Sequence, residues 1–246
     1  MFERRKINYP WEGRIEPFKI IGNVYFVGTF QASSHLIDTG DGLILIDTGY
    51  NNTLYLLVDS IYKLGYKPED VKYIINTHYH DDHTGGSDAM ANLSGAKNMI
   101  GRYDVEPARN MNVDIEIKDG DTLELGNTKI KFMETPGHTR GCISLFFDTV
   151  DDGITYRVGM FGGAGANTLV PSGFEYNGCR DDYFKSLERL KKETVDVFIG
   201  NHVWNNDTFT KAKILREGRE NPFIDKNIWN EFLEFCHNRA LTCIKE

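Results

Sequence analysis

The stretch Thr77-His78-Tyr79-His80-Asp81-Asp82-His83 places four potential metal ligands, three histidines and Asp82, within six residues. It follows residues 71–76, an apolar and β-branched run that predicts a buried strand. An extended backbone points alternate residues the same way, so the first two histidines can hold one ion while Asp82 and His83 face the other side. Imidazole and carboxylate ligands together favour zinc, with iron or manganese as alternatives. The stretch therefore predicts a metal site at the end of a strand.

Two further histidines follow predicted strands. His138 lies in Pro136-Gly137-His138-Thr139, after a strand predicted to end near Met133, and His202 follows a strand predicted over residues 195–199. Alone, each would usually be a surface residue or a satisfied core residue. Loops at strand ends are where functional sites are commonly built, and next to the first cluster both become candidate ligands.

The rest of the chain interleaves strand and helix patterns without a Pro-, Gly- or Ser-rich linker. This predicts an α/β (α+β) fold, with sheets covered by helices, in one domain spanning residues 1–246. Asn51 or Asn52 is expected to cap the first helix, and Gly65 to close it. Strands are predicted over 24–28, 35–38, 43–47, 71–76, 98–100, 122–125, 128–133, 142–147, 155–161 and 195–199, and helices over 54–64, 87–93, 183–192 and from 225 onward.

Composition narrows the function classes. The 246 residues carry 28 Lys and Arg against 36 Asp and Glu. The net charge of -8 argues against a protein that binds nucleic acids in general or that binds an anionic membrane surface. No apolar run is long enough to cross a bilayer, and the N-terminal residues lack the apolar segment of a secretory signal, so we expect a cytoplasmic protein. The four cysteines form no CxxC pair and are expected to be free thiols.

Four motifs in this order and spacing resemble the metallo-β-lactamase superfamily. They are the HxHxDH pattern at residues 78–83, LIDTG at residues 45–49, PGHT at residues 136–139 and a final histidine after a strand. The resemblance extends from about Val24 to Asn206. It implies a four-layer αβ/βα sandwich with a metal site at one edge.

The resemblance also implies two zinc ions per chain. Asp47 would orient the loop that bears the ligands, although a plain turn role is equally compatible with its position. Residues 160–167 lack the bridging Asp that is found in the glyoxalase II group. In lacking it, the chain resembles the His-rich third subclass of metallo-β-lactamases. The small residues in this stretch would leave room for substrate. The implied ligands are His78, His80 and His138 for the first zinc, and Asp82, His83 and His202 for the second.

By this resemblance, a zinc-bound hydroxide would cleave an amide or ester bond of a small, cyclic acyl substrate such as a β-lactam or lactone. Asp82 would be the catalytic residue that orients the nucleophile and takes its proton. The expected partner is that small molecule, with no nucleic acid and no membrane, and the oligomeric state stays open. A thioesterase of the glyoxalase II type, a phosphodiesterase or nuclease, and a non-catalytic metal-binding protein remain alternatives. The segments expected to select the substrate are 25–35, 165–180 with Phe174 and Tyr176, and Trp204 with Asn205.

Overall fold

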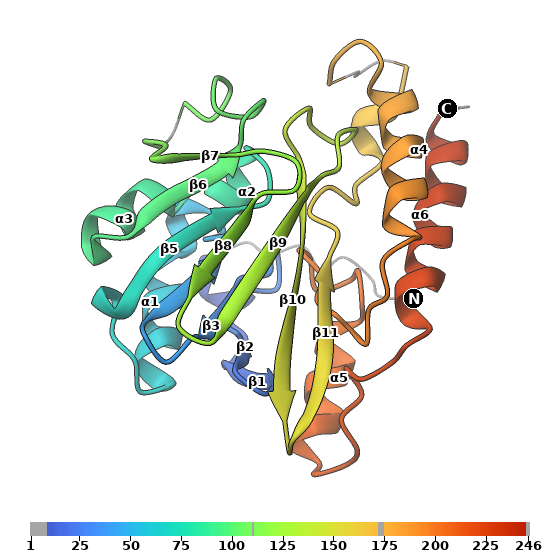
Figure 1. Ribbon diagram of the computed structural model, residues 1–246. Helices are drawn as coiled ribbons and strands as arrows, with labels where there is room; N and C mark the ends of the chain where they lie inside the picture. Colours follow the sequence, from blue (N-terminus) through green and yellow to red (C-terminus); the bar gives the residue numbers. More distant parts are fainter. Residues whose placement is uncertain (1–8, 110, 172–174, 245–246) are drawn as a thin grey trace.

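The computed structural model describes residues 9–109, 111–171 and 175–244, and two β-sheets face each other at its centre (Figure 1). The first sheet has seven strands in chain order, antiparallel from the first to the fourth and parallel from the fourth to the seventh. Its strands are β1 (Phe18–Ile21), β2 (Val24–Phe26), β3 (His35–Asp38), β4 (Leu43–Ile46), β5 (Val71–Asn76), β6 (Lys97–Gly101) and β7 (Ile115–Ile117).

The second sheet has five strands in the order β12-β11-β10-β9-β8. All its pairs are antiparallel except β11 with β12, which is parallel. A two-residue turn at Gly126 and Asn127 joins β8 to β9, as expected for the first of its hairpins. Its strands are β8 (Thr122–Leu125), β9 (Thr128–Glu134), β10 (Ile143–Asp151), β11 (Ile154–Met160) and β12 (Val197–Phe198).

The main core lies between the two sheets because their strands alternate their side chains between two apolar layers. In β4, Ile44 and Ile46 join the cluster that the second sheet completes with residues such as Phe132. The intervening Leu43 and Leu45 belong to a different cluster, which includes residues of the neighbouring helices. A strand that is apolar at every position, as β4 is, is thus buried on both faces.

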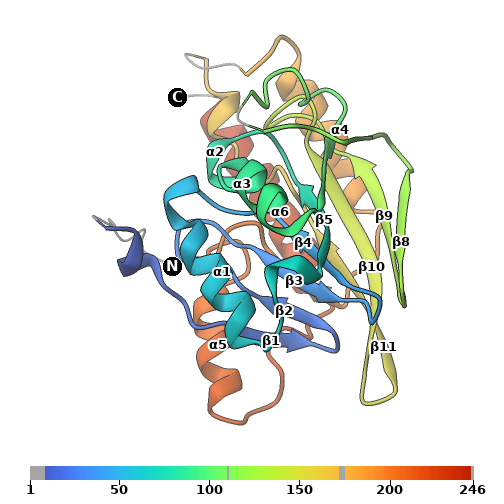
Figure 2. The ribbon, with the colours of Figure 1, turned by 90° about the vertical axis from the view of Figure 1, so that its left-hand side faces the viewer.

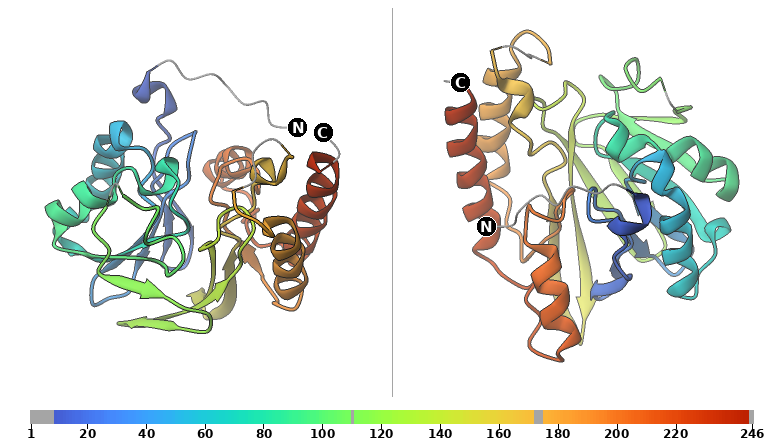
Figure 3. Two further views of the ribbon diagram at one scale, coloured as in Figure 1. Left: turned by 90° about the horizontal axis from the view of Figure 1, so that it is seen from above. Right: turned by 180° about the vertical axis from the view of Figure 1, so that it is seen from behind.

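Helices cover the outer face of each sheet (Figures 2 and 3). Leu57 and Ile61 of the first helix and Met90 of the third pack with the first sheet, while Tyr183 and Trp229 of α4 and α6 pack with the second. The predicted four-layer αβ/βα sandwich is confirmed. The α-helices are α1 (Leu54–Lys63), α2 (Asp81–Thr84), α3 (Ser87–Ser94), α4 (Cys179–Leu190), α5 (Thr208–Arg216) and α6 (Ile228–Cys243), with 3-10 turns at Pro10–Gly13, Asn51–Thr53, Pro68–Asp70 and Asn167–Leu169.

Several predicted boundaries are wrong. Asn51 and Asn52 do not cap α1, because they form their own 3-10 turn and Thr53 occupies the N-cap position. The strand predicted over 195–199 is only two residues long as β12. The pattern also missed the short strands β1 and β7 and the helix α5, whose apolar residues are too few to give a clear period. Gly65 does follow α1 in a left-handed conformation, as predicted.

The four cysteines, Cys142, Cys179, Cys236 and Cys243, are buried free thiols, in agreement with the sequence. Within the described ranges, no helix is both long enough and apolar enough to cross a membrane.

The two sheets touch at the β8–β9 turn, where glycine is required. The amide of Asn127 donates to the carbonyl of Thr39, just after β3, at 2.9 Å. A Cβ on Gly126 would lie 2.0 Å from that carbonyl oxygen, and the residue also has a φ of +50°. A side chain here would therefore separate the sheets as well as strain the turn.

We predict that Gly126→Ala lowers the free energy of unfolding well beyond the matched variant Gly120→Ala. Gly120 also has a positive φ, but its Cβ would meet nothing within 4 Å, so alanine there costs about 1 kcal/mol of backbone strain. Gly126→Ala should add about 1–3 kcal/mol for the steric conflict. Urea unfolding followed by tryptophan fluorescence measures both variants. Equal losses would show that Thr39 moves aside at no cost.

Candidate metal centre

The loops after β5 and β9 bring three histidines together. His78 and His80 lie on the segment leaving β5, and His138 lies on the segment leaving β9. One ring nitrogen from each falls within 4.8 Å of the other two, and His80 Nδ1 is 3.1 Å from His138 Nε2. The set predicted for the first ion is therefore assembled from strand ends that are some sixty residues apart in sequence.

The single turn of α2 supplies Asp82 and His83 to the adjoining position. Their ligand atoms form a second group with His78, again within 4.8 Å of one another. Asp82 Oδ2 lies 3.5 Å from His83 Nε2 and 3.7 Å from His202 Nε2. His202 thus reaches the cluster through Asp82, while His78 stands between the two groups; the sequence had placed His78 in the first group alone.

Hydrogen bonds on the outer side of the rings aim the inner nitrogens at the centre. His138 Nδ1 donates to the carbonyl of Gly165 at 2.8 Å, and His202 Nδ1 donates to the carbonyl of Gln31 at 2.9 Å. A carbonyl only accepts, so in both rings Nε2 keeps its lone pair and faces the cluster. His83 Nε2 is buried and has no hydrogen-bond partner in the described residues. An unsatisfied buried nitrogen beside a carboxylate fits a metal ion.

The pKa shifts of His78, His138 and Asp82 also suit a metal. Burial lowers the pKa of His138 to about 3 and that of His78 well below its usual value, so both rings are neutral ligands at pH 7. Burial alone would lower the pKa of His83, but the Asp47 carboxylate overcomes it and the net pKa is raised. Burial would raise the pKa of Asp82, yet the neighbouring His83 and His202 lower it overall, which favours its ionised form.

Asp47 is fully buried and ties the end of β4 to the metal loop. Its carboxylate accepts hydrogen bonds from the amide and the hydroxyl of Thr77, at 2.7 and 2.8 Å, and its Oδ2 lies 2.7 Å from His83 Nδ1. The residue adopts a left-handed φ of 55°, which is uncommon outside glycine. These contacts favour the orienting role over a plain turn role.

Asp104 is a second buried carboxylate, and the sequence did not indicate it. It accepts hydrogen bonds from the amide of Tyr79 at 3.0 Å, from the Thr139 hydroxyl at 2.6 Å and from the amide of Gly141 at 2.6 Å. One side chain therefore fastens the loop of His78 and His80 to the loop of His138. Burial raises its pKa to about 6, although the three hydrogen bonds oppose that shift. Asp104 lies four residues beyond the predicted strand 98–100, in a stretch without a motif.

The glycine-rich stretch after β11 has a different role from the one expected. A Cβ on Gly162 would lie 2.0 Å from the carbonyl oxygen of Ile143, and one on Gly163 would lie 2.4 Å from Cys142 Sγ. These two glycines allow close backbone packing and do not line the pocket. Ala164, Gly165 and the two residues after them do line it, so only the later part of the stretch leaves room for substrate.

A pocket of about 730 Å³ opens onto the histidine cluster. The predicted Trp204 and Asn205 line it, and Trp204 stacks on His202 with ring centroids 4.3 Å apart. Of the other expected substrate residues, Tyr176 instead donates to Asp182, and Phe174 lies outside the described residues.

His35 is not part of the site. It is buried in β3 with its ring edge against Phe26, and burial lowers its pKa to about 3. A neutral imidazole packed among apolar neighbours has a structural role, which is the role the sequence favoured for it.

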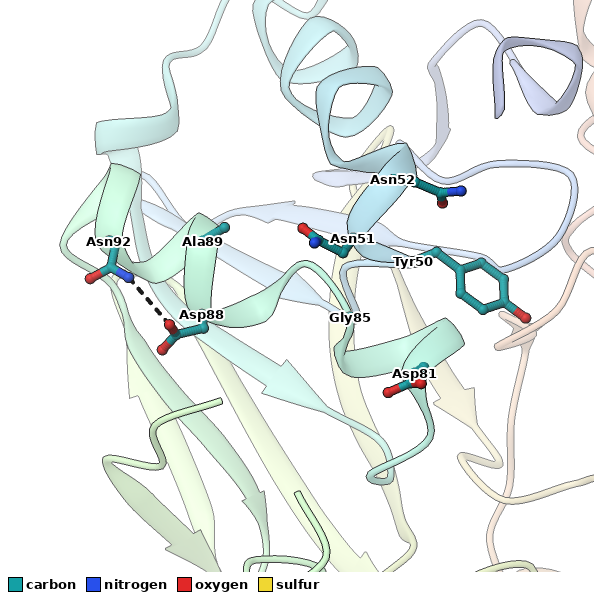
Figure 4. A pocket seen from close by; sticks show the side chains of 8 residues that line it. All are labelled: Tyr50, Asn51, Asn52, Asp81, Gly85, Asp88, Ala89 and Asn92. Atoms are coloured by element: carbon teal, nitrogen blue, oxygen red, sulfur yellow. Dashed lines mark hydrogen bonds between the residues drawn. The ribbon is translucent and has the colours of Figure 1, made fainter. Parts of the chain in front are cut away.

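A second concavity lies between α2, α3 and the 3-10 turn at Asn51–Thr53 (Figure 4). It is lined by polar side chains, including Asp81 and Asp88, and the Asp88 carboxylate accepts a hydrogen bond from Asn92. Within the described ranges, neither carboxylate belongs to a group that could hold a metal ion. We therefore place the chemistry in the histidine-lined pocket.

We predict that Asp104→Asn weakens zinc binding by about 10–100-fold, the usual effect of losing a side chain that orients ligand loops. The amide leaves at least one of three buried donors without an acceptor, which frees one loop from the other. Competition with a chromophoric chelator measures the zinc dissociation constant.

Asp119→Asn is the matched control for Asp104→Asn. The Asp119 carboxylate also accepts from a backbone amide, that of Glu134, but it touches neither metal loop. Its loss should reduce the melting temperature without changing the zinc dissociation constant. If both variants bind zinc as the parent does, Asp104 has only a general structural role.

Comparisons with known proteins agree with this geometry. The sequence family described as the Metallo-beta-lactamase superfamily matches residues 27–155, more than half of the chain. The hydroxyacylglutathione hydrolase of Maricaulis maris (strain MCS10) is 34% identical over 120 residues, which cover 49% of this chain and 43% of that protein. The N-acyl homoserine lactonase of Bacillus cereus is 29% identical over 202 residues, which cover 69% of this chain and 80% of that protein.

A solved structure extends the likeness to the whole chain. The class B3 di-zinc metallo-beta-lactamase LRA-12 from an Alaskan soil metagenome superimposes with a TM-score of 0.85 at 27% identity, covering 99% of this chain and 100% of that one. Together with the sandwich fold and the clustered histidines, these likenesses show that the chain belongs to the metallo-beta-lactamase superfamily.

Proposed function

We propose that this protein is a zinc-dependent hydrolase that cleaves an amide or ester bond of a small cyclic acyl substrate. The observation that carries the proposal is the convergence of five histidines and Asp82 in one cluster that opens onto a pocket. Acceptors anchor the outer ring nitrogens of His83, His138 and His202. His78, His80 and His138 would hold one zinc ion. Asp82, His83 and His202 would hold a second.

Bound zinc would supply Lewis acidity, which polarises a carbonyl oxygen and lowers the pKa of water to about 7. The chain's own contribution is to position the reactants and to accept a proton. Asp82 lines the pocket, is half-buried and has a lowered pKa, so its carboxylate is available to orient the attacking water and take its proton. Trp204 and the two alanines beside Gly165 line the same pocket and give that part of its wall an apolar surface.

The pocket supports a compact substrate. Aromatic and small side chains share its lining, which suits a ring with apolar substituents better than a polymer. The similar proteins named for β-lactamase and lactonase activity both act on cyclic acyl compounds, and that chemistry is what we carry over here.

The alternatives have weaker support. A glyoxalase II-like thioesterase would be expected to carry a bridging Asp, which residues 160–167 lack. A nuclease would need a basic surface, whereas the net charge is -8. A non-catalytic metal protein does not account for the pocket of about 730 Å³ that opens onto the ligands.

We predict two zinc ions per chain in metal-replete protein, because the six side chains form two adjoining sets. His202→Ala should retain only the zinc ion held by His78, His80 and His138. His138→Ala should lose that ion, with a fall in turnover of orders of magnitude. His237→Ala is the matched control, since that histidine packs on Phe184 away from the pocket. Elemental analysis after gel filtration counts the ions. A single ion in the parent protein would contradict the second site.

We predict that the zinc-loaded protein hydrolyses β-lactams or small lactones and that Asp82→Asn lowers turnover by about 10²–10⁴-fold with folding intact. The amide keeps the size of the side chain but removes the proton acceptor. Asp81→Asn, one residue earlier and exposed, should leave turnover near that of the parent.

The assay compares β-lactams, lactones, thioesters and phosphodiesters in parallel. Phosphodiester hydrolysis without activity on β-lactams or lactones would refute the proposal in favour of the nuclease branch. Full zinc occupancy with no turnover on any of these substrates would favour a metal-binding protein.

A further inference from the structure

The C-terminal helix α6 forms part of the wall of the histidine-lined pocket. Phe232, Phe235, Cys236 and Arg239 all line the pocket, and their spacing of three, four and seven residues places them on one face of the helix. This face lies next to the buried face of α6, whose residues, such as Trp229 and Leu233, pack against the second sheet. The packing of the sandwich therefore fixes the buried Phe232 and Cys236, and it places the exposed Phe235 and Arg239 beside them at the pocket.

Phe235 presents an unusual amount of apolar surface at this wall. Its side chain is 63% exposed, and its ring lies nearly parallel to that of Phe232 with centroids 6.3 Å apart. Phe30 and Trp204 line the same pocket from other segments. A large exposed ring beside other aromatic rings in a pocket favours binding of an apolar group.

Arg239 supplies the fixed positive charge of the same wall. Among the described residues that line the pocket there is no other Arg or Lys, and Asp82 is their one carboxylate. Arg239 has no hydrogen bond, ion pair or ring contact within the described part of the chain. By contrast, each of the other arginines there has a hydrogen bond, an ion pair or a ring contact, namely Arg14, Arg102, Arg109, Arg140, Arg157, Arg180, Arg189, Arg216 and Arg219.

We propose that Arg239 and Phe235 form a subsite for a carboxylate group and an adjoining aryl or alkyl group of the substrate. A guanidinium binds a carboxylate through two parallel hydrogen bonds, and the ring one helical turn earlier covers the apolar neighbour of that carboxylate. The inference rests on the proposed function, because it assumes that the scissile bond lies at Asp82 in the same pocket. It narrows the substrate class to anionic cyclic amides or esters.

The kinetic test compares benzylpenicillin with its methyl ester, which has the same ring and phenyl group but no carboxylate. We expect Arg239→Gln to lower kcat/KM for benzylpenicillin about 10-fold, mainly through KM, as for the loss of a charge-assisted hydrogen bond. For the methyl ester, kcat/KM should change less than about 2-fold. Arg239→Lys should be intermediate, and the exposed Arg219→Gln should match the parent. Equal changes for both substrates would overturn the subsite.

A binding test is independent of turnover. Calorimetric titration of the zinc-loaded protein with phenylacetate and with neutral phenylacetamide should give tighter binding of the anion, by about 10-fold, and Arg239→Gln should remove that difference. Phe235→Ala should weaken both ligands, whereas Leu241→Ala, an exposed apolar residue of α6 that does not line the pocket, should weaken neither.

The two tests fail separately. If neither penicillin is hydrolysed and the wider assay is also negative, the proposed function fails, while anion binding that depends on Arg239 still supports the subsite. If phenylacetate binds equally well to the parent and to Arg239→Gln, or binds to neither, the subsite is refuted whatever the protein hydrolyses.

Discussion

The buried carboxylate of Asp47 is the contact on which the metal centre depends. It joins the end of β4 to the start of the histidine loop by accepting from the amide and hydroxyl of Thr77, and it fixes the ring of His83. A left-handed non-glycine residue costs about 1–2 kcal/mol, which hydrogen bonds to a charged acceptor offset. Without this carboxylate, the Nδ1 of His83 would be buried without an acceptor, and the ring would be free to turn its Nε2 away from Asp82.

Asp104 links a loop of the first sheet to a loop of the second, whereas Asp47 links the end of a single strand to the histidine loop. The first three predicted ligands come from both sheets, so their geometry depends on how the sandwich closes at this edge. Asp104 follows β6 of the first sheet and binds Thr139 and Gly141, which precede β10 of the second. A Cβ on Gly141 would lie 2.6 Å from the Asp104 carboxyl carbon, so glycine is required for the carboxylate to come this close. The geometry of the metal loops therefore depends on how the two sheets pack together.

The sequence predicted the parts of the site that depend on local pattern. The spacing of His78, His80, Asp82 and His83 is visible in six residues, and His138 and His202 were found because each follows a strand pattern. The four-layer fold followed from the resemblance and from the interleaved strands and helices. Asp104 and Arg239 could not be found in the same way. The groups that Asp104 binds lie 25 or more residues away in the sequence, and the pocket that Arg239 lines is built from distant segments. A lone Asp and a lone Arg carry no periodic signal, and only the folded chain shows what they face.

The net charge of the protein and the charges inside the pocket act on an anionic substrate in opposite ways. A net charge of -8 repels anions at long range, but at physiological ionic strength the Debye length is about 8 Å, so distant surface carboxylates have little effect inside the pocket. Inside the pocket, the nearby groups determine the electrostatic potential. Arg239 has no carboxylate partner in the described residues, and burial keeps the imidazoles of His78 and His138 neutral. An anionic substrate would therefore gain its binding energy after entry rather than during approach. Its carboxylate would be held at α6 by Arg239, and this guanidinium has no carboxylate partner of its own within the described residues.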